Sequence, residues 1–171
     1  MRNTTKSGNT QGVISAQEKF SNKITKANRK ITSTFDYEFL DNQMEDLVYA
    51  WISSDLINGL DSNFKSNTLS FLKDYKSLIK TIEIEEKNTQ FDYLQLYKNF
   101  FDSWSLKSIK DILEHLRDAF IISETANDVG VRSRVFFVLE ISTDYLRRIN
   151  KIQKKSIEFA SQETKLAKPK S

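Results

Sequence analysis

Apolar residues recur at spacings of three and four along most of this chain, which is the period of a helix that packs on one side. A thin stripe of this kind begins near residue 16 and ends near residue 31. Broader stripes follow it, and they predict five further helices. We expect these helices at about residues 36–57, 62–88, 89–103, 105–122 and 131–159.

Residues that favour helix ends separate the stripes. Thr34 or Asp36 can cap the first of the five helices, since each offers a side-chain oxygen to free backbone N–H groups. Asn58-Gly59 accepts the left-handed geometry that commonly follows a helix, so we expect that helix to end there. Thr89 is the expected cap of the third helix.

Composition supports this helical interpretation. Four glycines and one proline in 171 residues are few, whereas folds with many tight turns need more of both. We therefore expect an all-α protein, either a bundle of about five helices or a short stack of antiparallel helical hairpins, with a long C-terminal helix and basic flexible ends. The expected division of the chain is a disordered lead (1–15), a marginal basic helix or linker (16–34), a helical domain (35–160) and a basic flexible tail (161–171).

Charge is divided between the ends and the middle of the chain. Residues 1–34 carry seven Lys or Arg and one Glu, and residues 147–171 carry eight Lys or Arg and two Glu. The residues between them carry eleven Lys or Arg and twenty Asp or Glu. The net charge of +3 therefore combines an acidic body with two basic ends. This pattern is typical of a protein that binds a partner through its ends.

The basic residues near the C-terminus follow helical spacing. They would present a ridge to the phosphates of a nucleic acid, with an affinity that falls steeply in salt. An acidic protein groove or an anionic membrane surface would also suit the ridge, and a frayed helix end that is merely kept soluble has the same pattern. The ridge residues are Arg147, Arg148, Lys151, Lys154 and Lys155. A second candidate set near the N-terminus is Lys19, Lys23, Lys26, Arg29 and Lys30.

These patterns predict a small non-enzymatic helical adaptor. We expect it to bind nucleic acid, RNA ahead of DNA, or an acidic protein through its basic ends. The alternative is a structural subunit of a larger assembly, or of a homo-oligomer, whose C-terminal helix packs against a partner helix. The contact residues would then be Ile149, Ile152 and Phe159.

No motif of an enzyme is present in the sequence. The glycines are isolated from one another, so none forms a phosphate-binding loop, and the absence of cysteine excludes disulfides and thiol catalysis. The single histidine, His115, could act as a base beside Asp111, Glu114 or Asp118. Without a second histidine or a nucleophile, we interpret His115 as an ordinary helix-surface residue. We expect no cofactor and no metal site.

Aromatic residues recur between residues 93 and 104. On a surface they could stack against nucleic-acid bases, but their spacing is that of a buried helix face, and we expect them in the core. They are Tyr93, Tyr97, Phe100, Phe101 and Trp104. We interpret Trp51 in the same way.

The lengths of the apolar runs predict where in the cell the protein is located. The polar residues 1–12 lack an apolar run of the length found in signal peptides. No stretch approaches the roughly 18 apolar residues of a membrane span. We therefore expect no membrane span, no signal peptide and an intracellular protein, either cytoplasmic or nuclear.

One segment resembles a known family. Ser133-Arg134-Val135-Phe136-Phe137-Val138-Leu139-Glu140, followed by Asp144 and Arg147, resembles the closing helix of the middle domain of eukaryotic translation initiation factor 4G and its relatives. In that helix a Ser-Arg pair is followed by an aliphatic residue, a Phe, a Leu and a Gln or Glu, with an Asp one turn further on. Phe136 replaces a residue that is usually basic. The resemblance implies HEAT-like hairpins and a scaffold that binds RNA, helicases or other factors.

Overall fold

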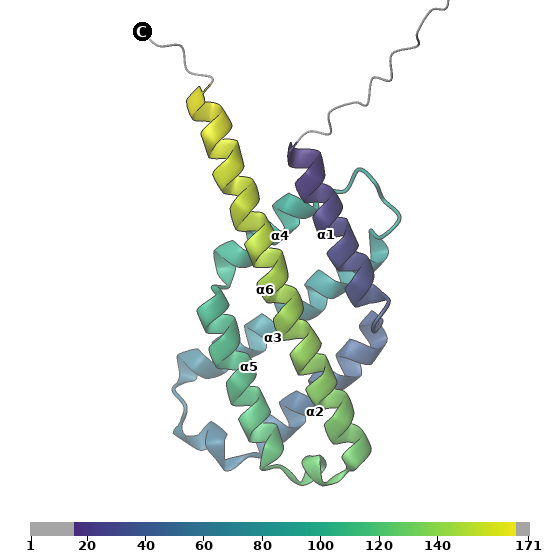
Figure 1. Ribbon diagram of the computed structural model, residues 1–171. Helices are drawn as coiled ribbons and strands as arrows, with labels where there is room; N and C mark the ends of the chain where they lie inside the picture. The colour runs from purple at the N-terminus through teal and green to yellow at the C-terminus, as the bar shows by residue number, and fades with distance from the viewer. Residues whose placement is uncertain (1–15, 167–171) are drawn as a thin grey trace, which may run out of the picture.

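The structure is a computed structural model that describes the backbone of residues 16–166 and the side chains of residues 18–162. This part of the chain contains six α-helices, two short 3-10 helices and no strand (Figure 1). The α-helices are α1 (Ala16–Thr32), α2 (Tyr37–Ser53), α3 (Ser62–Ile84), α4 (Tyr93–Ser103), α5 (Leu106–Ile121) and α6 (Val129–Leu166). The predicted all-α fold with a long C-terminal helix is confirmed. The disordered lead predicted at 1–15 lies outside the described residues.

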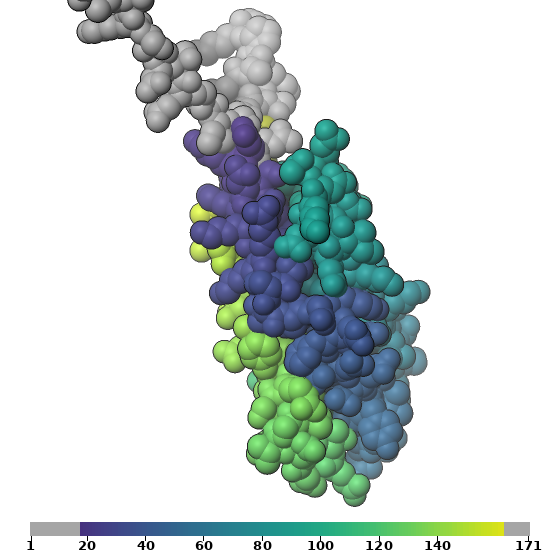
Figure 2. Space-filling view, turned by 90° about the vertical axis from the view of Figure 1, so that its right-hand side faces the viewer, coloured from purple at the N-terminus to yellow at the C-terminus, as the bar shows by residue number. Residues whose placement is uncertain are grey.

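The long helix α6, with 38 residues, organises the arrangement of the others. In Figure 1, α1 and α5 lie on either side of α6 and run antiparallel to it, while α2, α3 and α4 lie behind. Seen from the side in Figure 2, α1 lies between α6 and the teal segment that includes α4. None of the helices in residues 16–166 has an apolar stretch that could cross a bilayer.

Short polar side chains begin four of the helices. Asp36, Asp61, Asp92 and Ser105 each accept a hydrogen bond from the backbone N–H three residues later, over 2.7–3.0 Å. These bonds satisfy N–H groups that have no partner within the helix. Asp36 is therefore the cap of α2. The prediction of Thr89 as the cap of α4 is wrong, because Asp92 occupies that position.

The predicted end of α2 at Asn58-Gly59 is also wrong. α2 ends at Ser53, and Asp55–Gly59 forms a 3-10 helix, η1. The Ser54 hydroxyl donates a 2.8 Å hydrogen bond to the Trp51 carbonyl, so this side chain satisfies one of the free carbonyls at the end of α2. Gly59 does not take the left-handed geometry, since none of the described residues has a positive φ.

Both ends of α6 differ from the predicted positions. The helix begins two residues earlier than expected, because the Asp128 carboxylate accepts a 2.9 Å hydrogen bond from the Val131 N–H and supports the first turn. That hydrogen bond and a second one, from the Gly130 N–H, lower the pKa of Asp128. At the other end α6 continues to Leu166. The flexible tail predicted at 161–171 therefore begins inside a helix, and residues 167–171 lie outside the described part.

The predicted aromatic core is confirmed with one exception. Tyr93, Tyr97, Phe100 and Trp104 are buried, whereas Phe101 is only half-buried at the edge of the same core. The Trp104 indole donates a 2.9 Å hydrogen bond to Asp74 on α3. Large apolar side chains that are fully removed from water supply the main stabilisation of such a bundle. These residues include Trp51, Phe71, Leu40, Leu116 and Phe120.

Candidate nucleic-acid interface

The first basic segment is a docked helix. Ile24, Ala27 and Ile31 of α1 are at most 2% exposed, and α1 contacts α3, α4 and α6. The predicted marginal helix or linker at 16–34 therefore does not extend from the body as a flexible end. Its thin apolar stripe is sufficient for burial because α6 and α4 cover it from two sides.

A buried polar contact fixes the position of α1. The Asn28 side-chain oxygen accepts hydrogen bonds from the Tyr97 hydroxyl on α4 (2.6 Å) and the Tyr145 hydroxyl on α6 (2.9 Å). The two hydroxyl oxygens also lie within hydrogen-bonding distance of each other, and because each hydroxyl has a single proton, it donates either to Asn28 or to the other hydroxyl. Burial raises the pKa of both tyrosines far above the usual range, so both hydroxyls stay protonated and can donate. Sliding α1 along α6 would leave these polar atoms buried without partners, at about 1–3 kcal/mol each.

The antiparallel pairing of α1 with α6 brings the two basic segments to the same level. The rings of Phe20 and Phe159 lie 6.3 Å apart between their centroids, and Asn28 meets Tyr145 two turns further along α1. Lys23 lies between these two contacts on α1. The C-terminal cations from Arg148 to Lys155 lie between them on α6. Residues at opposite ends of the sequence are therefore neighbours in space.

Six of the predicted cations form one surface, which we call the basic seam. Lys30 and Arg148 line the same groove between α1 and α6. Residues spaced by multiples of about 3.6 share a helix face, and the other four cations follow that spacing from Lys30 or from Arg148. All six side chains are exposed. The basic seam consists of Lys19, Lys23 and Lys30 on α1 and of Arg148, Lys151 and Lys155 on α6.

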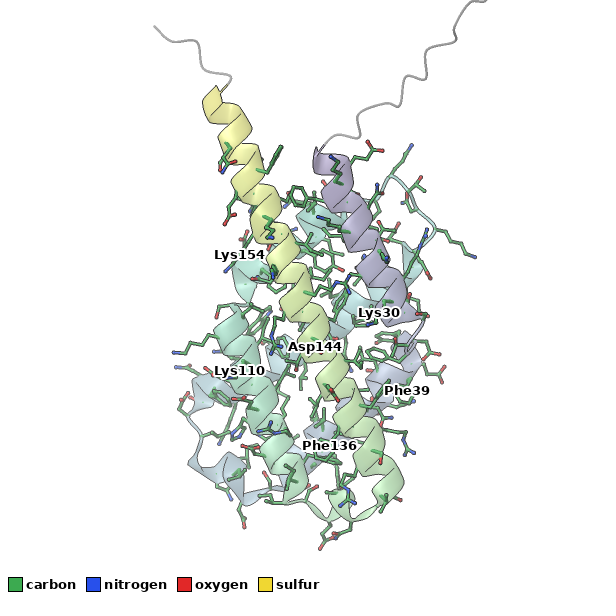
Figure 3. All side chains as sticks on the ribbon, viewed as in Figure 1. Lys30, Phe39, Lys110, Phe136, Asp144 and Lys154 are labelled. Carbon is green, nitrogen blue, oxygen red and sulfur yellow. The ribbon has the colours of Figure 1, made fainter. Side chains whose placement is uncertain are left out.

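The groove within the basic seam has a volume of about 290 Å³. Its apolar lining is formed by Ala27, Ile31, Ile141 and Tyr145. Lys30, Arg148, Asp144 and Thr34 supply its polar lining. Figure 3 shows Lys30 and Asp144 on neighbouring helices, on the face that is turned to the viewer. The groove therefore combines an apolar floor with cations contributed by both helices.

The cations of the basic seam are not held in ion pairs by the described part of the chain. No ion pair found within residues 18–162 involves any of its six cations. Asp144, the acidic residue of the groove, pairs with Arg147 over 3.2 Å. Lysines elsewhere do find partners, such as Lys98 with Asp102 at 2.7 Å. A row of unpaired cations creates a positive potential that attracts anionic ligands.

The other four predicted cations lie away from the seam. Arg147 lines a separate groove with Lys110 and Glu114 of α5, and Lys154, seven residues later, shares the helix face of Arg147. Lys26 and Arg29 line a cleft that also contains Glu86, from the connection between α3 and α4. The predicted C-terminal ridge is therefore divided between two sides of α6. The ten candidate residues do not form a single surface.

The residues predicted to contact a partner helix are occupied within the chain. Ile149 is fully buried in the core, and Ile152 is half-buried against it. Phe159 packs against Phe20 of α1 and remains 38% exposed. The prediction that Ile149 contacts another molecule is wrong, because α6 turns this residue toward its own bundle.

His115 is not the ordinary surface residue that was predicted. Its ring lies edge-on to Phe64, at 5.2 Å between centroids, and to Trp51, at 6.4 Å. Its Nε2 atom is buried and has no hydrogen-bond partner among the residues that the structure describes. Burial lowers the pKa of His115, and the nearby Asp118 carboxylate opposes that effect. Burial therefore favours the neutral imidazole, which packs between α2, α3 and α5.

Sequence reasoning missed Asn28, although a signal was present. Asn28 falls on the same helix face as Ile24, Ala27 and Ile31, where an apolar residue would be expected. A polar side chain at a buried position needs a hydrogen-bond partner. The sequence does not show that the partners are Tyr97 and Tyr145.

Comparison with known proteins gives no family assignment: no family model, no curated protein and no solved structure matches this chain. The resemblance of residues 133–147 to the initiation factor 4G middle domain therefore rests on those residues alone. They lie in the first half of α6, where Val135, Val138 and Leu139 are buried and Arg134 is exposed. This division is what any amphipathic helix on a bundle requires.

Proposed function

We propose that this protein is a small non-enzymatic adaptor that binds nucleic acid, RNA ahead of DNA, through the basic seam. The observation that carries the proposal is the convergence of two basic segments from opposite ends of the chain on one pair of helices. The seam is rigidly supported, because buried contacts between Asn28, Tyr97 and Tyr145 hold α1 against α6.

The spacing of the cations suits a ligand with repeated negative charges. Arg148 and Lys155 are seven residues apart, which is about 10 Å along a helix. Lys19 and Lys30 span about 16 Å on the neighbouring helix by the same rise. A phosphate backbone that follows the seam would meet cations from both helices. The body between residues 35 and 146 is strongly acidic, which disfavours contact with phosphates elsewhere on the molecule.

Charge reversal on the seam tests this proposal. We expect R148E/K151E/K155E to weaken binding of a fluorescein-labelled RNA of about 12 nucleotides at least tenfold at low salt. The matched control is K73E/K87E/K107E, which changes the net charge equally at three exposed lysines outside the seam. The proposal predicts a much smaller effect for the control. Equal losses in the two variants, or no loss in either, would overturn it.

An acidic protein is the alternative partner of the same surface. A pull-down from lysate at two salt concentrations, with and without nuclease, distinguishes the two partners. Nuclease removes the bound material if the seam holds nucleic acid. A protein that stays bound after nuclease treatment and leaves in high salt would show the alternative to be correct.

The structural-subunit function is the second candidate, supported by the exposure of Phe159 and Ile157 near the end of α6. Light scattering of the wild-type chain and of Phe159→Asp tests it. A stable dimer that dissociates in this variant would support assembly through α6. A monomeric wild-type chain would contradict self-assembly.

A further inference from the structure

Two phenylalanines of the described chain are exposed. The sequence contains twelve phenylalanines, and the structure describes the side chains of all of them. Ten are buried or half-buried, whereas Phe137 is 41% exposed and Phe159 is 38% exposed. Single exposed apolar residues are common on protein surfaces. The positions of these two residues relative to the seam are what distinguish them.

Both exposed phenylalanines lie on the cationic stripe of α6. Phe137 is eleven residues before Arg148, and Phe159 is eleven residues after it. Eleven residues make about three helical turns, so the three side chains share one helix face. Lys151 and Lys155 lie between Arg148 and Phe159 on that face. The stripe therefore has an aromatic ring at each end and cations in its second half.

The ring at Phe159 is fixed in place by α1. Phe20 packs against it with an interplanar angle of 59°, and the Lys23 ammonium lies 5.6 Å from the centroid of the Phe20 ring. A cation of the seam and an exposed aromatic ring are therefore close to each other at this end of the basic seam. This combination can hold a phosphate and its neighbouring base at the same time.

A row of cations flanked by exposed aromatic rings suits a single-stranded nucleic acid, because such sites combine a positively charged track with rings on which bases stack. The bases of a duplex are already paired and stacked, so a duplex offers the seam only its phosphates. An unpaired strand also offers the faces of its bases. The distance between Phe137 and Phe159 is about 33 Å along the helix, which fits the range of about 4–16 nucleotides per site on single strands.

We infer that the basic seam selects single-stranded RNA, with phosphates bound by its cations and unpaired bases stacked on Phe137 and Phe159. This inference rests on the proposed function and adds the strandedness of the ligand and two aromatic contacts. Asp144 lies on the same stripe, but its pairing with Arg147 reduces its repulsion of a phosphate. The binding energy from stacking is available only to an unpaired strand.

The test compares one RNA sequence as a single strand and as a duplex. F137L/F159L keeps apolar side chains at both positions, including the contact with Phe20, but removes the flat rings. We expect this variant to lose about fivefold or more in affinity for the single strand for each ring removed, with little change for the duplex. Y49L, which removes a 68% exposed ring on α2, is the matched control and should change neither affinity.

A spectroscopic readout makes the test independent of stability. Trp51 and Trp104 are buried, so F159W adds an exposed indole at the proposed stacking position. Unpaired RNA should quench the added emission, whereas the duplex should not. Equal effects of F137L/F159L on the two ligands, or an unquenched F159W that still binds RNA, would overturn the inference while leaving the charged seam in place. Failure of the wild-type chain to bind either RNA would overturn the proposed function as well.

Discussion

The Tyr145 hydroxyl on α6 donates a 2.9 Å hydrogen bond to the Asn28 side-chain oxygen on α1, across 117 positions of sequence. This contact lies directly beneath the groove of the basic seam, because Tyr145 and Ala27 also line that groove. It sets the level at which α1 meets α6. The position of the α1 lysines relative to the α6 cations therefore depends on this buried polar contact as well as on the buried apolar residues of α1.

Removing the Asn28 side chain should destabilise the fold. Asn28→Ala removes the acceptor that the buried Tyr97 and Tyr145 hydroxyls share. One hydroxyl can still donate to the other, so one buried O–H loses its partner, which should cost about 1–3 kcal/mol of unfolding free energy. Urea denaturation followed by circular dichroism measures this change. Asn22→Ala is the control, because Asn22 is an exposed position on the same helix. A loss of stability from Asn22→Ala as large as that from Asn28→Ala would contradict the role of the buried contact.

Alanine substitutions at Asp92 and at Thr89 test which of these residues caps α4. Asp92→Ala removes the 3.0 Å hydrogen bond to the Gln95 N–H and should cost about 1 kcal/mol. In a chain of this size that loss lowers the Tm by about 2–4 °C. Thr89→Ala should leave the Tm nearly unchanged, since Thr89 is exposed and precedes the helix. The reverse order of Tm shifts in a thermal melt would show that Thr89 is the cap.

The stability of the protein should decrease when His115 becomes protonated. Burial lowers the pKa of His115 in the folded state, whereas an unfolded histidine has a pKa of about 6.5. The unfolded chain therefore binds the proton first, and stability decreases as the pH falls through that value. His115→Gln cannot take up the proton.

The measurement for His115 is the unfolding free energy between pH of about 7.5 and 5.5. As the pH falls, the unfolding free energy of the wild type should decrease relative to that of His115→Gln. A constant difference in unfolding free energy over this range would contradict the lowered pKa of His115 in the folded state. A difference that changed in favour of the wild type would mean that the folded protein stabilises the charged form.

Most of the fold could be predicted from apolar spacing. Helices α3 and α5 and the long α6 follow stripes at intervals of three and four, and each lies close to its predicted residue range. The ends of the helices could be predicted less well. The end of α2 depends on a hydrogen bond from the Ser54 hydroxyl to the Trp51 carbonyl, and Asn58-Gly59 is an equally good local signal that the chain does not use. Local residues compete for such positions, and the tertiary structure decides between them.

The sequence identifies the cations of the candidate site, but it does not show that they lie together on one surface. Lys19, Lys23, Lys30, Arg148 and Lys155 were all identified from charge and spacing. Their assembly requires α1 to run antiparallel to α6 at one particular level, and contacts across more than a hundred residues fix that level. Arg147 and Arg148 are neighbours in the sequence but line different grooves. The sequence alone does not predict this, because each groove depends on which helix lies beside α6.

The salt dependence of RNA binding tests the composite seam most directly. Six phosphate contacts on a single strand predict a slope of about −4 in a plot of log affinity against log salt concentration. Neutralising either half of the seam, with K19Q/K23Q/K30Q or R148Q/K151Q/K155Q, should reduce the slope to about −2, while K73Q/K87Q/K107Q should leave it unchanged. A slope that responds to only one helix, or to the control variant, would contradict the claim that α1 and α6 bind RNA together.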